Sequence, residues 1–466
     1  MSALRTMLVL VFAGLGGTAL AQGVTLPEYH FVELDNGAVF ILTEKRDVPL
    51  IGVTAKIRGG AVTDSNDKSG LSRLFAEMLE KGAGERDAGS FAEAVDSVGA
   101  RLSAHSGLES ITISGEFLAR DADLLVELLA DMLRTPILSK AEFAKLRDRN
   151  ADLLRAAKDG DLRSLTSVYG NAWLFGEHPY GNPIGGDESS LEGLRHDDLL
   201  DHYQDFVGAD RLVVSLVGDF DATEMINQLT AAFSDWRRAA QPLPEFDAPA
   251  PEQGRRVLLV DKPGATQTYF WVGNVGVAYG YGQRAELDIA NTLFGGRFTS
   301  LLVDEMRTKA GLTYGVRSVL VRPSLPGSFA IVSYTKTEST VVALDLALEL
   351  LTRLRVEGFD DELITSGKNY ILGQFPPRLE TASQLASQFA ALQAAGLDES
   401  YINDYGAAIA GAASEDIHAV ISSAYPSPDD LVFVIIGDAE LIRDDIAKYG
   451  PVTEMAITEP RFRPQP

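Results

Sequence analysis

Short apolar runs alternate with amphipathic stretches along most of the chain. Residues 31–42 are predicted to form a β-hairpin, because two apolar stretches flank the turn pair Asn36-Gly37. A strand over residues 50–57 follows, and then a helix over about residues 69–81. This alternation favours an α+β fold in which a mostly antiparallel or mixed sheet carries helices packed on one face.

Two sequence motifs of the capping-box type mark later helix starts. The first begins at Ser90 and is expected to open a helix that buries Phe91, Val95 and Val98. The second begins at Ser139. In both, a serine is followed three residues later by a glutamate, which can satisfy free backbone donors at a helix N-terminus.

Matching strands recur in the two halves of the chain. Two apolar strands end in Gly-Asp, and their glycines, Gly218 and Gly437, are 219 positions apart. Two further strand pairs align at a similar offset. The matched pairs are 50–57 with 269–275, 110–117 with 328–334, and 211–219 with 431–438. A general likeness among α/β chains is the alternative explanation, but three matches at nearly one offset favour an internal repeat.

The segment between the two repeats lacks apolar periodicity. Residues 241–254 contain four prolines and are predicted to be an extended linker. The sequence therefore predicts an N-terminal domain over residues 23–240 and a homologous C-terminal domain over residues 255–466. Two such domains could face each other and enclose a chamber.

The composition and the first 21 residues indicate the cellular compartment of the protein. The chain has 466 residues, a formal net charge of −25 and no cysteine, which excludes disulfides and thiol chemistry and argues against nucleic acid as a partner. Residues 1–21 have the basic residue, short apolar region and Ala-Leu-Ala end of a signal peptide, although a membrane anchor is the alternative. We expect an exported periplasmic protein with no membrane span after cleavage.

Five segments together resemble the M16 (pitrilysin/insulinase) family of zinc peptidases. They are LDNGAVFILTE (34–44), RGGAVTDSNDKSGLSRLFAEMLEKG (58–82), HPYGNPIGGDESSLEGL (178–194), LVVSLVGDFD (212–221) and NTLFGGRFTSLLVDEMRTKAGLTYGV (291–316). The order of segments is the family's, and the resemblance spans nearly all of the mature chain. It implies the LuxS/MPP-like metallohydrolase fold with two homologous domains.

The resemblance also locates a zinc motif that this chain has lost. The family carries His-x-x-Glu-His, in which two imidazoles one helical turn apart share a zinc ion and the glutamate activates water. Here those positions hold Arg73, Ala76 and Glu77, and the distal ligand position aligns with Asp152 or Leu153. We therefore expect no metal site in this chain. Arg73 and Glu77 either form an ion pair or belong to a solvated helix face.

A strand is predicted after the degenerate motif, over residues 102–110. The family pairs this strand with the substrate backbone and typically carries Asn-Ala where this chain has Ser103-Ala104. His105 comes next; the plain interpretation is a surface histidine.

One binding feature of the family is retained in the second half. Arg307 and Tyr314 match an Arg and a Tyr that reach the active site from the opposite domain. Arginine can hold a peptide carbonyl or carboxylate, and a tyrosine hydroxyl can donate to a developing oxyanion. The alternatives are a helix-surface charge for Arg307 and a half-buried strand aromatic for Tyr314.

These features predict a non-catalytic, substrate-binding companion subunit of a heteromeric M16 zinc peptidase. The chain itself would bind no cofactor. The zinc would belong to a partner with the intact His-x-x-Glu-His motif, and the substrates would be peptides or unfolded segments. Two alternatives stay open: a free-standing peptide-binding or scaffold protein of this fold, and an active peptidase with an atypical metal site.

Overall fold

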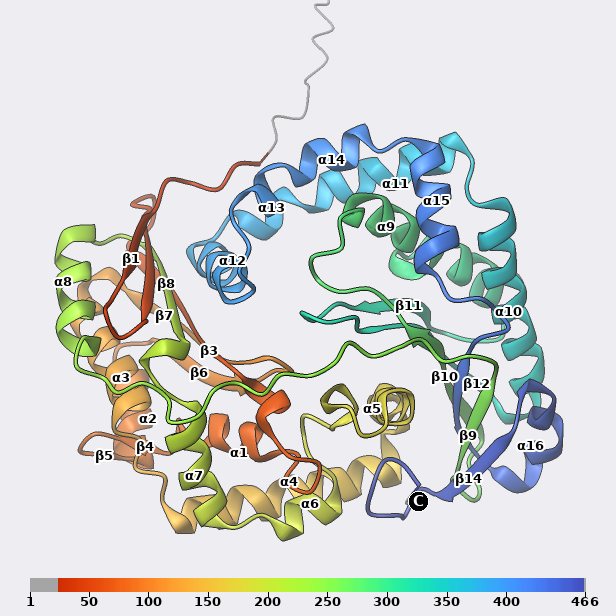
Figure 1. Ribbon diagram of the computed structural model, residues 1–466, viewed down its shortest axis with the longest axis horizontal. Coiled ribbons are helices and arrows are strands. Elements are labelled where there is room, and N and C mark those ends of the chain that lie inside the picture. The colour runs from red at the N-terminus through yellow and green to blue at the C-terminus, as the bar shows by residue number, and fades with distance from the viewer. Residues whose placement is uncertain (1–23, 465–466) are drawn as a thin grey trace, which may run out of the picture.

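The computed structural model describes residues 24–464, so the signal peptide expected over residues 1–21 lies outside the described part. The chain forms two six-stranded sheets that stand at opposite sides of the molecule, with helices outside and between them (Figure 1). Each sheet belongs to one half of the sequence. This is the predicted α+β architecture.

The N-terminal half contains the first sheet, a small two-stranded sheet and eight α-helices among the described residues. The strands are β1 (His30–Glu33), β2 (Val39–Glu44), β3 (Leu50–Arg58), β4 (Gly82–Ala83), β5 (Arg86–Asp87), β6 (Arg101–Ser106), β7 (Ser110–Leu118) and β8 (Leu212–Gly218). The helices are α1 (Leu71–Met78), α2 (Ala88–Ser97), α3 (Ala122–Arg134), α4 (Lys140–Gly160), α5 (Leu162–Phe175), α6 (Glu188–Gly193), α7 (His196–Phe206) and α8 (Ala222–Phe233).

The C-terminal half contains the second sheet, further α-helices and two π-helical segments. The strands are β9 (Arg256–Asp261), β10 (Gln267–Val275), β11 (Val316–Val321), β12 (Ser328–Lys336), β13 (Val432–Gly437) and β14 (Val452–Ala456). The helices are α9 (Arg284–Asn291), α10 (Thr340–Glu357), α11 (Asp361–Gln374), α12 (Ala382–Ala394), α13 (Ser400–Asn403), α14 (Tyr405–Gly411), α15 (Ser414–Ala424) and α16 (Ala439–Ile446), and the π-helical segments are η5 (Thr292–Gly296) and η6 (Val303–Lys309).

The two sheets repeat one strand order. The first runs β1-β2-β8-β3-β7-β6 and the second, read from the matching edge, β14-β9-β13-β10-β12-β11. In both, one parallel pair (β2 with β8, β9 with β13) is followed by antiparallel pairs. Only the first strand differs in direction, since β1 is antiparallel and β14 parallel to its neighbour. The strands that the sequence matched between its halves occupy equivalent places.

Each sheet is covered on both faces, which the sequence did not predict. Its own helices pack on the outer face, whereas a helix from the other half packs on the inner face: α12 lies on β3 and β8, and α5 lies on β10 and β13. Figure 1 shows both helices between the sheets. Double coverage explains why β8 and β13 are buried at every position.

Glycines permit this close approach. A Cβ at Gly52 on β3 would lie 2.5 Å from the backbone nitrogen of Ser383 at the start of α12. A Cβ at Gly170 in α5 would lie 2.6 Å from the indole ring of Trp271 on β10. Any side chain at either position would force the helix away from the sheet.

Two local expectations change. Helix α2 begins before Ser90, because the carboxylate of Asp87 accepts the Ser90 N–H at 2.8 Å and serves as the N-cap. That helix buries Phe91 and Val95, while Val98 is only partly buried. Ser139 does precede α4, but its side chain makes no capping hydrogen bond.

Residues 241–254 form no helix or strand, yet they are held in place. The Asn274 side chain donates to the Glu252 carbonyl at 3.0 Å, and the Glu252 N–H donates back to the Asn274 amide oxygen at 2.9 Å. Over residues 24–464, no helix is both long and apolar enough to cross a bilayer.

Candidate functional site

The degenerate zinc motif lies on α1, which packs between β6 and helices α4 and α7. The buried Asp64 carboxylate accepts hydrogen bonds from the N–H groups of Gly70 and Ser72 and so fixes the start of the helix. Burial raises the pKa of Asp64 to about 7, against the opposing effect of these hydrogen bonds. The helix is thus anchored where Arg73 and Glu77 project from one face.

Glu77 is the centre of a cationic cluster. Its carboxylate accepts from Arg73 Nε at 3.0 Å, from Arg149 Nη2 at 3.0 Å and from Asn150 Nδ2 at 3.1 Å. The ion pair between Arg73 and Glu77, one of two readings left open by the sequence, is therefore present. The helical i, i+4 spacing that would bring two imidazoles to a metal brings a guanidinium to a carboxylate instead.

This donor set does not fit zinc. Two guanidinium groups have no lone pair to give and repel a divalent cation, and Ala76 is a fully buried methyl group in place of a base. Across residues 24–464, no cluster of three or more histidine, cysteine, aspartate or glutamate side chains could hold a metal ion. That the chain binds no metal stays a prediction.

Neither residue that the sequence aligns with the distal ligand position forms a hydrogen bond or ion pair with Glu77. Asp152 points to Arg155, which it contacts at 3.0 Å, and Leu153 is 56% exposed. The α4 residues that face Glu77 are instead Arg149 and Asn150, and Asn150 is only 5% exposed. A slip of two residues rotates a helical position by about 200°, so local alignment could not decide which side chain faces α1.

The strand β6 lies at the free edge of the N-terminal sheet. Ser103 and Ala104 stand on it as expected, but the Ala104 N–H donates to the Glu80 carboxylate at 2.7 Å. His105 is exposed beside them, and desolvation, with a smaller effect of Lys56, lowers its pKa. A peptide that pairs with this edge would have to displace Glu80 from Ala104.

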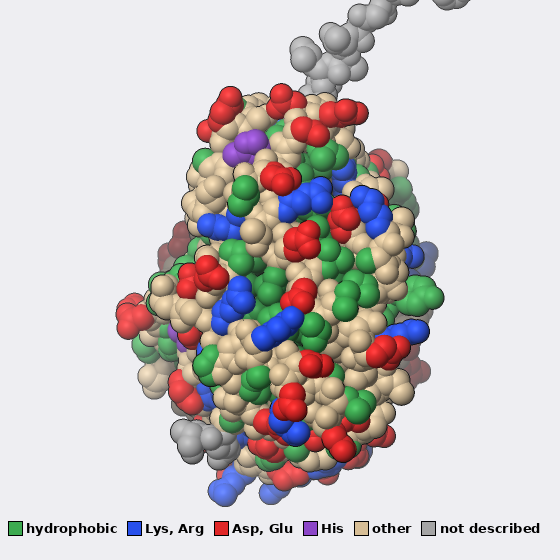
Figure 2. All heavy atoms as spheres, turned by 90° about the vertical axis from the view of Figure 1, so that its right-hand side faces the viewer, with side chains coloured by type: hydrophobic (Ala, Val, Ile, Leu, Met, Phe, Trp, Pro, Cys, Tyr) green, Lys and Arg blue, Asp and Glu red, His purple; other side chains and the backbone are tan. Residues whose placement is uncertain are grey.

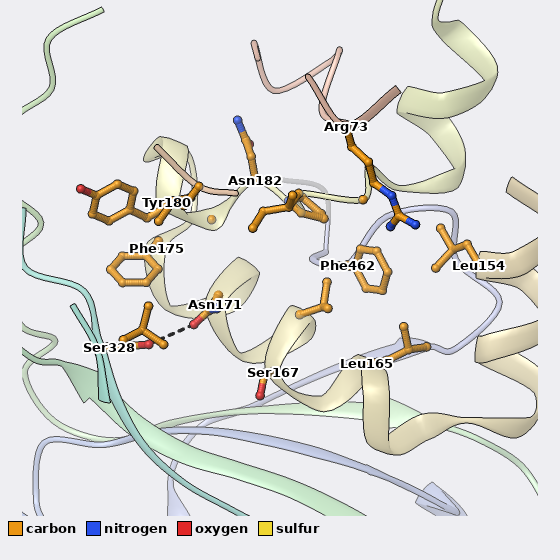
Figure 3. Close-up of a pocket in the computed structure, with 18 of the residues that line it drawn as sticks. Arg73, Leu154, Leu165, Ser167, Asn171, Phe175, Tyr180, Asn182, Ser328 and Phe462 are labelled. Atoms are coloured by element: carbon orange, nitrogen blue, oxygen red, sulfur yellow. Dashed lines mark hydrogen bonds between the residues drawn. The ribbon is translucent and has the colours of Figure 1, made fainter. Parts of the chain in front are cut away.

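A cavity of about 410 Å³ lies beside the cluster, where the two halves of the chain meet. It is bounded by α4, α5, the segment 180–186, the β11–β12 hairpin and Phe462 near the C-terminus. Figure 3 shows Arg73 at one end, next to Leu154 and Phe462. At the other end Ser328 donates to the Asn171 side chain at 3.2 Å, near Phe175.

Arg307 and Tyr314 stand on a different part of the molecule. Arg307 belongs to η6, a π-helical segment in which the Ala310 N–H donates to the Glu305 carbonyl five residues earlier. Its guanidinium lies 4.7 Å above the ring of Phe298, which is 71% exposed. Tyr314 follows in the connection to β11 and is 82% exposed, so it is not the half-buried aromatic that the alternative assumed.

The structure does not bring this pair to the Arg73 cluster. Val321, at the end of β11, lines the cavity that Arg73 enters. Tyr314 precedes the opposite end of the same strand, roughly 20 Å away at about 3.3 Å per residue. Within the described residues, neither Arg307 nor Tyr314 lines this cavity or pairs with a residue of the degenerate motif.

Local sequence patterns gave no sign of the cavity. Its wall combines residues from α4, from α5, from a hairpin of the second half and from the C-terminal segment, and each of these carries ordinary apolar side chains. The sequence does not single out Asn150 either. Its role depends on the hydrogen bond to Glu77, which joins α4 to α1.

Two models of one family match the chain. Residues 40–187 match "Insulinase (Peptidase family M16)", and residues 193–371 match "Peptidase M16 inactive domain". The chain belongs to the M16 peptidase family and is an inactive member of it, which confirms the resemblance seen in the sequence.

Curated relatives are distant but cover most of the chain. A non-peptidase homolog from Helicobacter pylori is 25% identical over 387 residues, covering 82% of this chain and 85% of that protein. An uncharacterized zinc protease from Streptomyces coelicolor is 23% identical over 363 residues, covering 76% and 77%.

Solved structures share the fold. A peptidase M16 inactive domain from Pseudomonas fluorescens superposes with a TM-score of 0.81 at 21% identity, covering 88% of this chain and 98% of that one. A Helicobacter pylori protease gives the same TM-score at 18% identity, covering 88% and 100%. At these identities the likeness shows the fold alone, and it confirms the predicted fold class.

Proposed function

We propose that this chain is the non-catalytic, substrate-binding companion subunit of a periplasmic, heteromeric M16 zinc peptidase. The observation that carries the proposal is the exposed segment with Phe298, Arg307 and Tyr314. No hydrogen-bond or ion-pair partner within residues 24–464 takes up the Arg307 guanidinium or the Tyr314 hydroxyl. Large aromatic and arginine side chains left unpaired at a surface favour recognition of another molecule.

In this proposal the two subunits supply different parts of one active site. A partner with an intact His-x-x-Glu-His motif would supply the zinc and the water-activating glutamate. Arg307 would hold a peptide carbonyl or carboxylate, with Phe298 fixing the guanidinium plane. Tyr314 would donate to the oxyanion that forms at the scissile carbonyl. Neither residue pairs with the Arg73 cluster of its own chain, which supports action on a partner's site.

A free-standing peptide-binding protein is the second candidate. The cavity beside Arg73 favours it, since that cavity is built entirely from this chain. An active peptidase with an atypical metal site is the least supported reading, because guanidinium groups surround the only acidic residue of the former motif.

The first experiment is an affinity pull-down of the tagged mature chain from its native compartment, followed by mass spectrometry. We expect a partner of similar size that bears His-x-x-Glu-His. Self-association without such a partner would instead favour the free-standing protein.

Reconstitution with that partner tests the two residues. Arg307→Ala and Tyr314→Phe are each expected to lower kcat/KM by about tenfold or more, the effect of losing one donor to the transition state. Arg120→Ala is the matched control, since the Arg120 side chain is 76% exposed and lies in the N-terminal half, after β7. Unchanged cleavage in both site variants would refute the assigned roles.

A further inference from the structure

The cavity beside the former zinc site has an unusual polarity. Most of its wall is apolar, with leucines from α4 and α5 and the rings of Phe175 and Phe462. Of the described residues that line it, Arg73 is the only charged one. Figure 3 shows the Arg73 side chain directed toward Leu154 and Phe462 at one end of the cavity. A single cation in an apolar wall suits a ligand that is apolar with one negative charge.

The Arg73 guanidinium is held in place by Glu77 but keeps free hydrogen-bond donors. Its Nε donates to Glu77 at 3.0 Å, and within the described residues neither terminal nitrogen has an acceptor. A Cβ at Gly185 would lie 2.9 Å from Nη1, so the guanidinium rests against the backbone of that loop. Two donors of a positioned guanidinium match the two oxygens of a carboxylate.

Asn171 supplies the second polar contact. Asn171 and Ser328 line the far end of the cavity, where the Ser328 hydroxyl donates to Asn171 Oδ1 at 3.2 Å. Within the described residues the Asn171 Nδ2 has no acceptor, so it is free to donate to a carbonyl of a ligand. Asn150 also lines the cavity, but its Oδ1 is enclosed and its Nδ2 donates to Glu77.

We propose that this cavity binds the free C-terminus of a peptide whose last residue is apolar. The terminal carboxylate accepts from Arg73, a preceding peptide carbonyl accepts from Asn171 Nδ2, and the terminal side chain lies among Leu154, Leu165 and Phe462. A fatty acid also offers an apolar carboxylate, but it has no amide carbonyl for Asn171. The site does not depend on the companion role, because every residue in it belongs to this chain.

Fluorescence anisotropy on the isolated mature chain tests the inference without any partner. The probes are a short labelled peptide that ends in a free phenylalanine carboxylate, the same peptide as its C-terminal amide, and dodecanoate as a competitor. We expect the acid to bind at least tenfold more tightly than the amide, and dodecanoate to bind at least tenfold more weakly than the acid.

Two arginine variants separate the cavity from the cluster. Both Arg73 and Arg149 donate to Glu77, but only Arg73 lines the cavity. Arg73→Met should abolish the preference for the acid and Arg73→Lys should restore part of it, whereas Arg149→Met should keep it. Circular dichroism melting checks that the variants fold, and the comparison of acid with amide on the unaltered chain needs no variant.

Three outcomes would overturn the proposal. The first is that the unaltered chain binds the acid and the amide equally, or binds neither. The second is that Arg149→Met removes the preference as completely as Arg73→Met. The third is that dodecanoate binds as tightly as the peptide acid. Because no partner is present, these results are distinguishable from failure of the companion role.

Discussion

Arg73 and Glu77 keep the geometry of a metal motif while reversing its chemistry. Side chains at i and i+4 still meet on one face of α1, but a guanidinium donates where an imidazole would accept a metal. Arg149 and Asn150 then complete the coordination of Glu77 from α4. Where the motif would bind zinc, Glu77 is instead held by hydrogen bonds from its neighbours.

This arrangement predicts how metal binding could be restored. The mature chain should bind no zinc, and Arg73→His with Ala76→Glu should bind none either, since Glu77 and Asn150 remain. Adding Glu77→His and Asn150→Glu supplies a complete ligand set and should give stoichiometric zinc, measured by elemental analysis after dialysis. Stoichiometric zinc in the unaltered chain would contradict the prediction.

His202 on α7 predicts how the free energy of unfolding depends on pH. It is 3% exposed against the ring of Phe75, and burial lowers its pKa from 6.5 to about 4. As the pH falls below 6.5 the unfolded chain takes up a proton that the folded chain refuses until about pH 4. The stabilisation present above pH 6.5 is therefore lost on acidification, by about 3 kcal/mol at pH 4.

Urea unfolding between pH 7.5 and 4 measures this effect. The free energy of unfolding should fall less steeply for His202→Leu than for the unaltered chain. His30→Gln, at an exposed position on β1, is the control and should leave the slope unchanged. Parallel curves for the chain and His202→Leu would show that this histidine does not titrate in the expected range.

At the level of elements, each half of the chain contributes one helix to the sheet of the other half, and we call this the exchange of α5 and α12. Tyr169 and Leu165 of α5 pack on the C-terminal sheet, and Leu385 and Phe389 of α12 pack on the N-terminal sheet. Each helix therefore completes the core of the half to which it does not belong in sequence. Strands that would otherwise face solvent on one side can be apolar at every position.

The contact of Gly170 with Trp271 tests the exchange. Gly170→Ala places a methyl group 2.6 Å from the indole ring, so it should destabilise the chain by about 1–3 kcal/mol through overpacking. Gly373→Ala in α11 meets no atom within 4 Å and should be neutral or stabilising by up to about 1 kcal/mol. Thermal melting of both variants compares them directly, and equal midpoints would contradict the packing.

Over the whole molecule, polar contacts join the two halves besides the exchanged helices. Glu109, in the β6–β7 hairpin loop, accepts from the Ser324 N–H, the Tyr180 hydroxyl accepts from the Leu325 N–H at 3.1 Å, and Lys158 donates to the Glu459 carbonyl at 2.5 Å. Figure 2 shows acidic and basic side chains mixed over the face that carries α10 and α16, so the net charge of −25 is not gathered there into one field.

These contacts predict that neither half is stable alone. A chain that ends at Ala240 loses α12 and exposes the apolar residues Val39, Ile41, Val213 and Val217. It should bind a hydrophobic dye and aggregate, whereas the two halves expressed together should associate and melt in one transition. A monomeric N-terminal half that binds no dye would show that α12 is dispensable.

The sequence determined the elements and the local chemistry of this protein. Strand and helix positions, and the shared helix face of Arg73 and Glu77, are set within single elements by apolar periodicity and helical spacing. The loss of zinc ligands was visible for the same reason. The internal repeat was visible because matching strands recur at nearly one offset. The cap at Asp87 does not follow from the sequence alone, because Asp87 and Ser90, three positions apart, can both cap a helix and the backbone geometry chooses between them.

Tertiary structure alone decided which distant residues act together. That Asn150 rather than Asp152 faces Glu77 depends on the rotation of α4 against α1, and the cavity depends on several segments from both halves. The exchange of α5 and α12 depends on how the two sheets face each other. Such contacts join residues tens to hundreds of positions apart, and local periodicity carries no information about their register.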